Sequence, residues 1–130
     1  MKFRIVLCLV AMAAVAATAV AQEATVTPLL TQDLAGIAGK EGTMVMVEYA
    51  PGGSSAEHRH DAAVFVYVLE GAVVMQVKGG QEMTLGPGQT FYESPEDVHT
   101  VSRNASTTQP TKLLAVHVKQ KGAPLTVYTK

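Results

Sequence analysis

Three histidines form the pattern in this sequence that could hold a metal ion. His58 and His60 are separated by one residue, and on a strand such side chains point to the same face. His99 lies in a later apolar segment. Neutral imidazoles suit iron, manganese, nickel, copper or zinc, and not calcium or magnesium. The pattern predicts one divalent transition-metal site at His58, His60 and His99, although an isolated pair of this kind also occurs as two exposed residues at a loop edge.

Glu93 is the candidate for a fourth ligand. It shares strand parity with Phe91, whose bulk indicates an inward face. An acidic residue at the end of an apolar strand either faces a charged partner or lies exposed, and the sequence leaves both possibilities open. Glu57 and Asp61 flank the histidine pair with the opposite parity, so we expect them to face solvent. His117, in a terminal apolar strand, is expected to be a packed or half-exposed residue and not a ligand.

The residues around these candidates are typical of short strands separated by turns. We expect about eight strands, at residues 43–49, 64–69, 72–78, 81–85, 89–93, 98–103, 112–119 and 125–129. The Gly79-Gly80 pair predicts a hairpin turn. One window after the apolar start, 29–38, keeps a weak helical period. The pattern predicts an antiparallel all-β sandwich or barrel, because closing the sheet removes exposed strand edges.

Two segments of the chain resemble the two sequence motifs of the cupin family. The matching residues are Gly52, His58, His60 and Gly71 for the first motif, and Gly88, Pro95 and His99 for the second. The resemblance covers residues 52–104. It implies an antiparallel cupin-type jelly-roll β-barrel that forms one domain over residues 22–130. It also implies a metal bound inside the barrel by His58, His60 and His99.

The sequence departs from the cupin pattern at one ligand position. The first motif usually has a glutamate where this chain has Val64 and Phe65, and neither side chain can bind a metal. The asparagine that usually follows the last histidine is displaced by one, to Asn104. The site is therefore either a three-histidine site or one completed by a carboxylate from elsewhere, for which Glu93 is the preferred residue.

The resemblance leaves two classes of function open. A metalloenzyme would act on a small organic molecule, as cupin dioxygenases, decarboxylases, isomerases and lyases do, and the ligand set resembles that of the three-histidine iron dioxygenases. The alternative is a non-catalytic periplasmic module that binds a metal or a small ligand. Apart from Glu93, no convincing general acid or base is recognisable in the sequence, which slightly favours the second class. A shared fold does not decide between them.

The start of the chain has the layout of a secretory signal peptide. Lys2 and Arg4 precede an apolar run, and Ala19-Val20-Ala21 presents small residues to a signal peptidase. The run is shorter than the roughly 18–20 residues that a membrane-spanning helix needs. We therefore expect cleavage after residues 1–21, no stable membrane insertion, and a periplasmic or secreted domain. The single cysteine, Cys8, would leave with the signal.

Charge and the terminal strands indicate the kind of partner. Eleven acidic and eight basic residues follow the expected cleavage site, so the formal charge of the mature chain is −3. Without a basic stripe, nucleic acid is not an expected partner, whereas a small-molecule ligand is. Apolar strands around Val26 and Val127 could leave a sheet face uncovered, from which we predict a homodimer.

Overall fold

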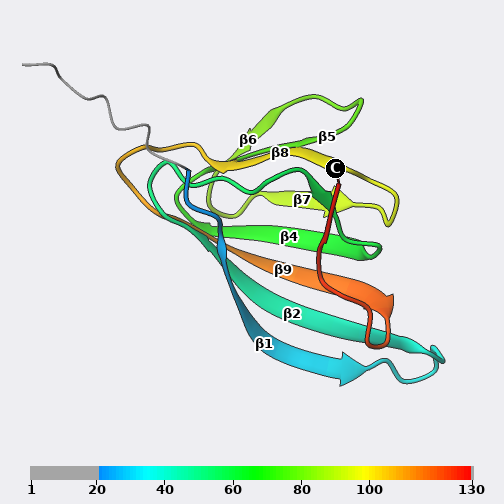
Figure 1. Ribbon diagram of the computed structural model, residues 1–130. Helices are drawn as coiled ribbons and strands as arrows, with labels where there is room; N and C mark the ends of the chain where they lie inside the picture. Colours follow the sequence, from blue (N-terminus) through cyan, green and yellow to red (C-terminus); the bar gives the residue numbers. More distant parts are fainter. Residues whose placement is uncertain (1–20, 130) are drawn as a thin grey trace, which may run out of the picture.

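Two five-stranded antiparallel sheets face each other in the computed structural model, which describes residues 21–129 (Figure 1). The first sheet has the order β1 (Thr25–Asp33), β2 (Lys40–Tyr49), β9 (Thr111–Gln120), β4 (Ala63–Glu70) and β7 (Thr90–Glu93). The second has the order β10 (Val127–Tyr128), β3 (His58–Arg59), β8 (His99–Asn104), β5 (Val73–Val77) and β6 (Met83–Leu85). This arrangement confirms the predicted antiparallel jelly roll. The expected signal segment, residues 1–21, lies outside the described residues except for Ala21.

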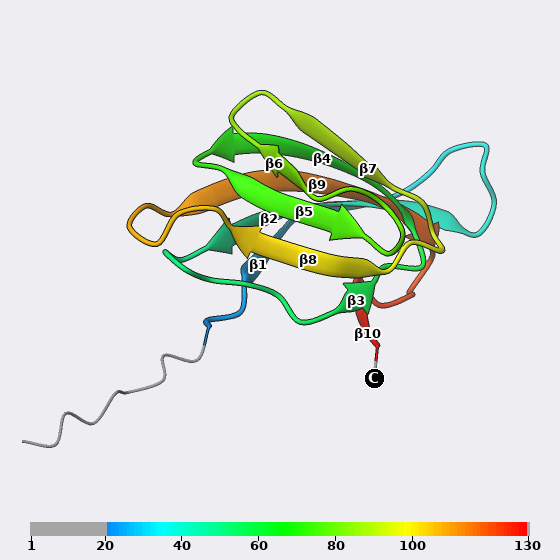
Figure 2. The same ribbon diagram turned by 90° about the horizontal axis from the view of Figure 1, so that it is seen from above.

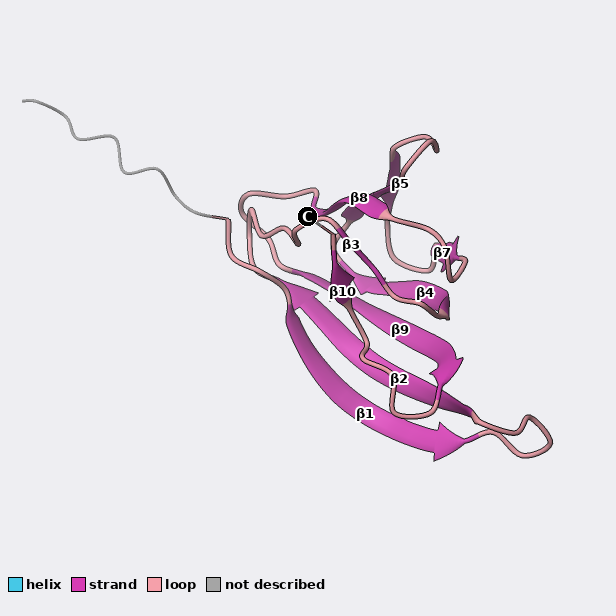
Figure 3. Ribbon diagram, turned by 45° about the vertical axis from the view of Figure 1, so that its right-hand side comes forward, coloured by secondary structure: helices cyan, strands magenta, loops and turns pink. Residues whose placement is uncertain are grey.

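The described chain consists of strands and connecting loops (Figure 3). Within residues 21–129, no helix is long and apolar enough to span a membrane. The helix that the weak period at 29–38 indicated is therefore not formed. Residues 29–33 belong to β1, which pairs with β2, and the chain then turns toward Lys40.

The sequence indicates only an apolar strand around Val26 where β1 lies, because β1 is at the edge of its sheet. All nine residues of β1 are exposed, so its sequence carries no alternation between a buried and a solvent-facing side. Its register with β2 shifts between Pro28 and Leu30, directly after a residue that has no N–H to donate. Backbone pairing with β2, and not its apolar pattern, sets the conformation of this segment.

Alternation along β9 builds the wall of the barrel interior. Its inward residues are all buried, namely Thr111, Leu113, Ala115, His117 and Lys119. The valines of β4 complete this wall, and the core continues across to Val73 and Met75 of the opposite sheet. Figure 2 shows the strands of the two sheets from above. Burying each such aliphatic side chain stabilises the fold by about 1.5–3 kcal/mol.

Gly71 shows why a motif glycine is needed to position these strands. It follows β4 with a φ of 70°, a conformation that residues with a Cβ rarely adopt. A Cβ at this position would also collide with the backbone carbonyl of Pro110, at the start of β9. The turn therefore lets the end of β4 pass directly against the neighbouring strand.

Candidate metal centre

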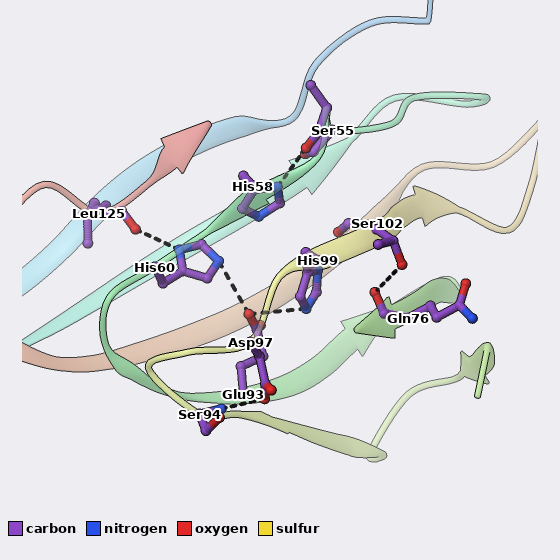
Figure 4. A network of polar contacts seen from close by, with 12 residues as sticks. Ser55, His58, His60, Gln76, Glu93, Ser94, Asp97, His99, Ser102 and Leu125 are labelled. Carbon is purple, nitrogen blue, oxygen red and sulfur yellow. Dashed lines mark hydrogen bonds and ion pairs between the residues drawn. The ribbon is translucent and has the colours of Figure 1, made fainter. Parts of the chain in front are cut away.

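The three predicted histidines meet inside the barrel. His58 of β3 pairs directly with His99 of β8, and their ring centres lie 5.3 Å apart. His60 lies just beyond the end of β3, with its ring centre 4.8 Å from that of His58 and 6.2 Å from that of His99 (Figure 4). His58 and His99 are buried, with 7% and 2% of their surface exposed. The structure thus brings together residues from both sequence motifs.

A tight turn sends the chain away from the cavity immediately after His60. Asp61 has a φ of 48°, and aspartate tolerates this left-handed conformation better than most residues. Its carboxylate pairs with Arg59 at 3.0 Å on the surface. Glu57 and Asp61 are both exposed, as their strand parity predicted.

Glu93 faces the same interior space. It is 3% exposed, and its Oε2 lies 3.1 Å from His99 Nε2 and 3.5 Å from His60 Nε2. Of the two environments left open by the sequence, the structure places this carboxylate in the buried one. Burial on its own would raise the pKa of Glu93, but the contact with His99 and the charges of the neighbouring imidazoles hold that pKa below its ordinary value. Glu93 is therefore an anionic partner for the histidines.

Two backbone carbonyls fix the ring orientation of His58 and His60. His58 Nδ1 lies 2.7 Å from the carbonyl oxygen of Ala56, and His60 Nδ1 lies 2.6 Å from that of Leu125. A carbonyl can only accept, so Nδ1 carries the proton in each ring and Nε2 of the neutral ring keeps its lone pair. A histidine that binds a metal is usually oriented in this way by its other nitrogen.

The pKa of His58 agrees with a neutral ring. Burial lowers this pKa below its ordinary value, and the hydrogen bond to the Ala56 carbonyl opposes the shift only in part. Neutral imidazole is the form that binds metal ions. The position of His58 therefore keeps the ring in its ligand form at neutral pH.

The cluster contains buried polar atoms that other protein groups do not satisfy. Within residues 21–129, four buried side-chain atoms have no hydrogen-bond partner: Glu93 Oε2, His99 Nδ1, His99 Nε2 and His117 Nδ1. Although Glu93 Oε2 and His99 Nε2 are close, they are not aligned as a hydrogen bond. Buried polar atoms are nearly always paired in native proteins, so a concentration of exceptions needs a reason.

His117 is the site residue that sequence reasoning missed. We expected a packed or half-exposed residue and not a ligand. Its side chain is packed, at 3% exposed, and it also lines the cavity, with its ring centre 4.9 Å from that of His60. It stands opposite Thr43 on β2 and Val64 on β4. Burial lowers the pKa of His117 to about 4. Its shared parity with Leu113 and Ala115 was a signal that could have found it.

The cavity beside these residues is small and has apolar walls. Its volume is about 90 Å³, which is room for a few water molecules or a small ligand. Its apolar lining includes Val45, Val47, Val64, Val66, Leu113 and Ala115. Leu125, Thr126 and Tyr128 of the C-terminal segment also line it. A ligand here would lie between the histidines and these apolar side chains.

The donor set fits a transition metal by chemistry and by spacing. A metal–nitrogen bond of about 2.0–2.1 Å places ring centres that share one ion about 4.5–6.4 Å apart, and the three observed separations lie in this range. Across residues 21–129, however, no three His, Cys, Asp or Glu side chains are already arranged around one common point. The carboxylate of Glu93 lies against two of the imidazoles instead, so its side chain and theirs would have to adjust on binding.

Comparisons with known proteins agree with this fold. Residues 45–117 match the family model described as Cupin domain. An uncharacterized conserved protein with a double-stranded beta-helix domain from Klebsiella pneumoniae is 19% identical, with a TM-score of 0.65 over 83% of this chain and 85% of that one. No curated protein sequence matches the chain.

Two structural neighbours are enzymes by name. Oxalate oxidase, in complex with the substrate analogue glycolate, is 21% identical with a TM-score of 0.63, over 82% of this chain and 55% of that one. The DMSP lyase DddQ from Ruegeria pomeroyi is 20% identical with a TM-score of 0.59, over 68% of this chain and 43% of that one. The matched region thus spans less than half of the lyase. At these identities the likeness shows the fold alone.

Proposed function

Because this chain belongs to the cupin domain family, we propose that it binds one divalent transition metal through His58, His60, His99 and Glu93. We further propose that it acts on a small organic molecule in the cavity beside that metal. The observation that carries the proposal is the carbonyl-anchored pair of imidazoles next to a buried carboxylate. Imidazole and carboxylate ligands suit iron, manganese, nickel, copper or zinc.

The metal would supply Lewis-acid or redox chemistry of the dioxygenase, decarboxylase or isomerase type. The chain's own residues have separate tasks. The carbonyls of Ala56 and Leu125 hold two ligand rings in one tautomer. The charge of Glu93 would balance part of the charge of a bound metal. Apolar walls keep water away from the ligand, which strengthens every polar contact inside.

The structural neighbours support a small-molecule function. One is an oxalate oxidase and another a DMSP lyase, and both names refer to small organic substrates. The second candidate is a binding module without turnover. It is favoured by the position of Glu93, which contacts two imidazoles and so is not free to transfer a proton.

Elemental analysis of the protein purified from its native compartment tests the metal proposal. We expect close to one transition-metal ion per chain, and no bound metal in a His58→Ala, His60→Ala, His99→Ala triple variant. Full retention of metal by that variant would exclude the site. Stoichiometric iron with oxygen uptake on a panel of small organic acids would favour the enzyme. Zinc or nickel without turnover would favour the binding module.

We also propose that the domain is exported and forms a homodimer. The edge strand β1 supports a dimer, because its nine residues are exposed and Val26, Leu29 and Leu30 are about half exposed, at 47%, 50% and 55%. Such an edge is a template for pairing with another chain. Light scattering at tens of micromolar should give twice the chain mass, and a monomer would contradict the dimer.

Amino-terminal sequencing of the native protein tests the export. The sequence should begin at Gln22.

A further inference from the structure

The outer face of the first sheet carries two rows of uncharged side chains that cross all five strands. Residues paired across neighbouring strands point to the same face, so the strand register defines each row. The first row consists of Leu30, Met44, Val116, Phe65 and Tyr92. The second row consists of Thr27, Met46, Leu114, Tyr67 and Thr90. Apart from the two threonines, every member is apolar or aromatic, and the rows alternate along β9 with its buried, inward-facing residues.

The aromatic members of these rows are exposed. Phe65, Tyr67 and Tyr92 are 55%, 47% and 53% exposed, and the rings of Phe65 and Tyr92 lie 5.2 Å apart. An aromatic side chain has about 150–250 Å² of surface to bury, so these three together leave roughly 230–390 Å² in contact with water. Leu30, at 55% exposed, extends the patch to β1. A contiguous apolar patch of this size marks an interaction surface, whereas single exposed apolar residues do not.

We propose that this face binds a second copy of the chain, so that the first sheets of two barrels pack face to face. The inference rests on the proposed homodimer and names its interface. Leu30 connects the two proposals, because it is one of the exposed residues of β1 that support the dimer and also the outer end of the first row. The interface would therefore continue from β1 across β2, β9 and β4 to β7.

The size of the face is close to what a stable dimer needs. On either side of the apolar rows lies a row of small, polar or charged residues: Gln32, Gly42, Val118 and Ala63 on one side, and Thr25, Glu48, Lys112 and Glu70 on the other. Five strands and four rows span about 20 Å in each direction, or roughly 400–600 Å² in projection. The accessible area of an uneven surface exceeds its projection, and a standard interface buries about 800 Å² per partner. An apolar centre with a polar rim is also the usual anatomy of an interface.

The charges at the two ends of the face suit a second copy. Lys40 lies at one end of β2, and Glu48, Lys112 and Glu70 lie in the row at the other end. Glu48 pairs with Lys112 at 3.3 Å, so the charge of Glu70 leaves that end acidic. A twofold axis across the strands places the Lys40 end of each copy over the acidic end of the other, which makes the face self-complementary. A lipid surface would instead favour an excess of basic residues around the patch.

The test places a charge in the centre of the proposed interface. The dissociation constant of the dimer is measured by sedimentation over a dilution series for the wild type, Phe65→Glu and Met83→Glu. In Phe65→Glu the dimer would bury a carboxylate without a partner, so we expect its dissociation constant to rise at least about thirtyfold, the effect of losing an interface hot spot. Met83→Glu is the matched control, because Met83 is 45% exposed but lies on β6 of the other sheet. Its dissociation constant should equal that of the wild type.

The wild type separates this inference from the proposed homodimer. A monomeric wild type would contradict the homodimer itself. A dimeric wild type with an unchanged dissociation constant in Phe65→Glu would overturn only the interface, as would equal losses in both variants. If Phe65→Glu does not fold, isotope-filtered NMR on mixed labelled and unlabelled wild-type chains decides. Contacts from the methyl groups of Leu114 or Val116 in one copy to the aromatic rings of the other would support the face, and contacts confined to β1 would overturn it.

Discussion

The barrel interior contains two buried polar clusters that differ in how completely their hydrogen bonds are made. In the asparagine cluster (Tyr49, Ser102, Asn104 and Thr111), Asn104 Nδ2 donates to three backbone carbonyls, and Oδ1 accepts from Ser106 N and Thr111 Oγ1. The hydroxyl of Tyr49 bonds to those of Ser102 at 2.7 Å and Ser55 at 2.9 Å. None of these four side chains has an unpaired buried atom within residues 21–129.

The histidine cluster (His58, His60, Glu93, His99 and His117) is the opposite case. It contains all four unpaired buried side-chain atoms found in the described part of the chain. Along β2 and β9, the apolar cross-strand pairs Val45–Ala115 and Val47–Leu113 lie between His117 and the Tyr49–Thr111 pair of the asparagine cluster. The same barrel therefore satisfies one set of buried polar groups and leaves another open. We infer that the first set serves stability and the second serves ligand binding.

The largest effect should come from removing a proposed metal ligand. Structural zinc sites contribute about 10–16 kcal/mol through four ligands, or roughly 2.5–4 kcal/mol for each. His60→Ala should therefore weaken metal binding by about two to three orders of magnitude, measured by competition with a chelator. Ser102→Ala, on the same strand as His99 but in the asparagine cluster, is the matched control and should bind metal like the wild type. An equal loss of metal affinity in both variants would contradict the assignment of separate roles to the two clusters.

A substitution in the asparagine cluster should lower the stability of the fold and leave metal binding unchanged. Asn104→Ala leaves several buried groups without partners, so we expect it to lower the free energy of unfolding by about 2–3 kcal/mol in urea titration. The folded fraction should still bind metal normally. Gln109→Ala is the control, because Gln109 gives Asn104 only its backbone oxygen and its side chain is exposed. A marginal loss in Asn104→Ala would show that the cluster is not structural.

The features of the histidine cluster that depend on strand alternation and motif spacing could be predicted from the sequence. Strand parity placed Glu93 on the inner face, and the motif spacing paired His58 with His99, as the structure has them. Metal ligation by these residues stays a prediction. The helical window failed because β1 is an edge strand with all its residues exposed, so its sequence carries no alternation that marks it as a strand.

His117 shows why the rest could not be predicted. Its own strand alternates clearly, but its role depends on the position of β9 between β2 and β4. That position is set by pairing between segments far apart in sequence. The contact of His60 with the Leu125 carbonyl is equally non-local. The alternation along β9 indicates that His117 faces inward, but no local pattern indicates which residues it meets there or that Leu125 lies beside His60.

Glu93→Gln should give an intermediate effect within the histidine cluster. The amide keeps the shape of the carboxylate but not its charge, so we expect metal affinity to fall about tenfold, the lower end of the usual loss when a polar partner of a metal site is altered. Metal preference should shift toward ions that tolerate a neutral set of ligands. Calorimetric titration with several divalent ions measures both. An unchanged affinity would indicate a three-histidine site, with Glu93 acting only on the imidazoles.

A buried ion pair beside the histidine cluster should give the smallest effect and sharpen the comparison further. Lys119 is 4% exposed and donates to Glu41 and to the Ala123 carbonyl, and Glu41 also accepts from Gly122 N. The hydrogen bond from Lys119 holds the pKa of Glu41 below its ordinary value of 4.5, although burial opposes the shift. This pair is satisfied, like the asparagine cluster, and should therefore contribute to stability.

The pH dependence of Glu41→Gln tests this contribution. A lowered pKa in the folded state means that the ionised carboxylate stabilises the fold at pH values above 4.5, and that this stabilisation is lost as the pH falls through the lowered value. In metal-free protein, thermal unfolding should show Glu41→Gln below the wild type at pH 7, with a gap that narrows as the pH falls below 4.5. Asp33→Asn, which breaks an exposed pair with Lys121, should show little gap at any pH. A gap for Glu41→Gln that stays constant with pH would mean that side-chain packing, and not the ion pair, stabilises this end of the barrel.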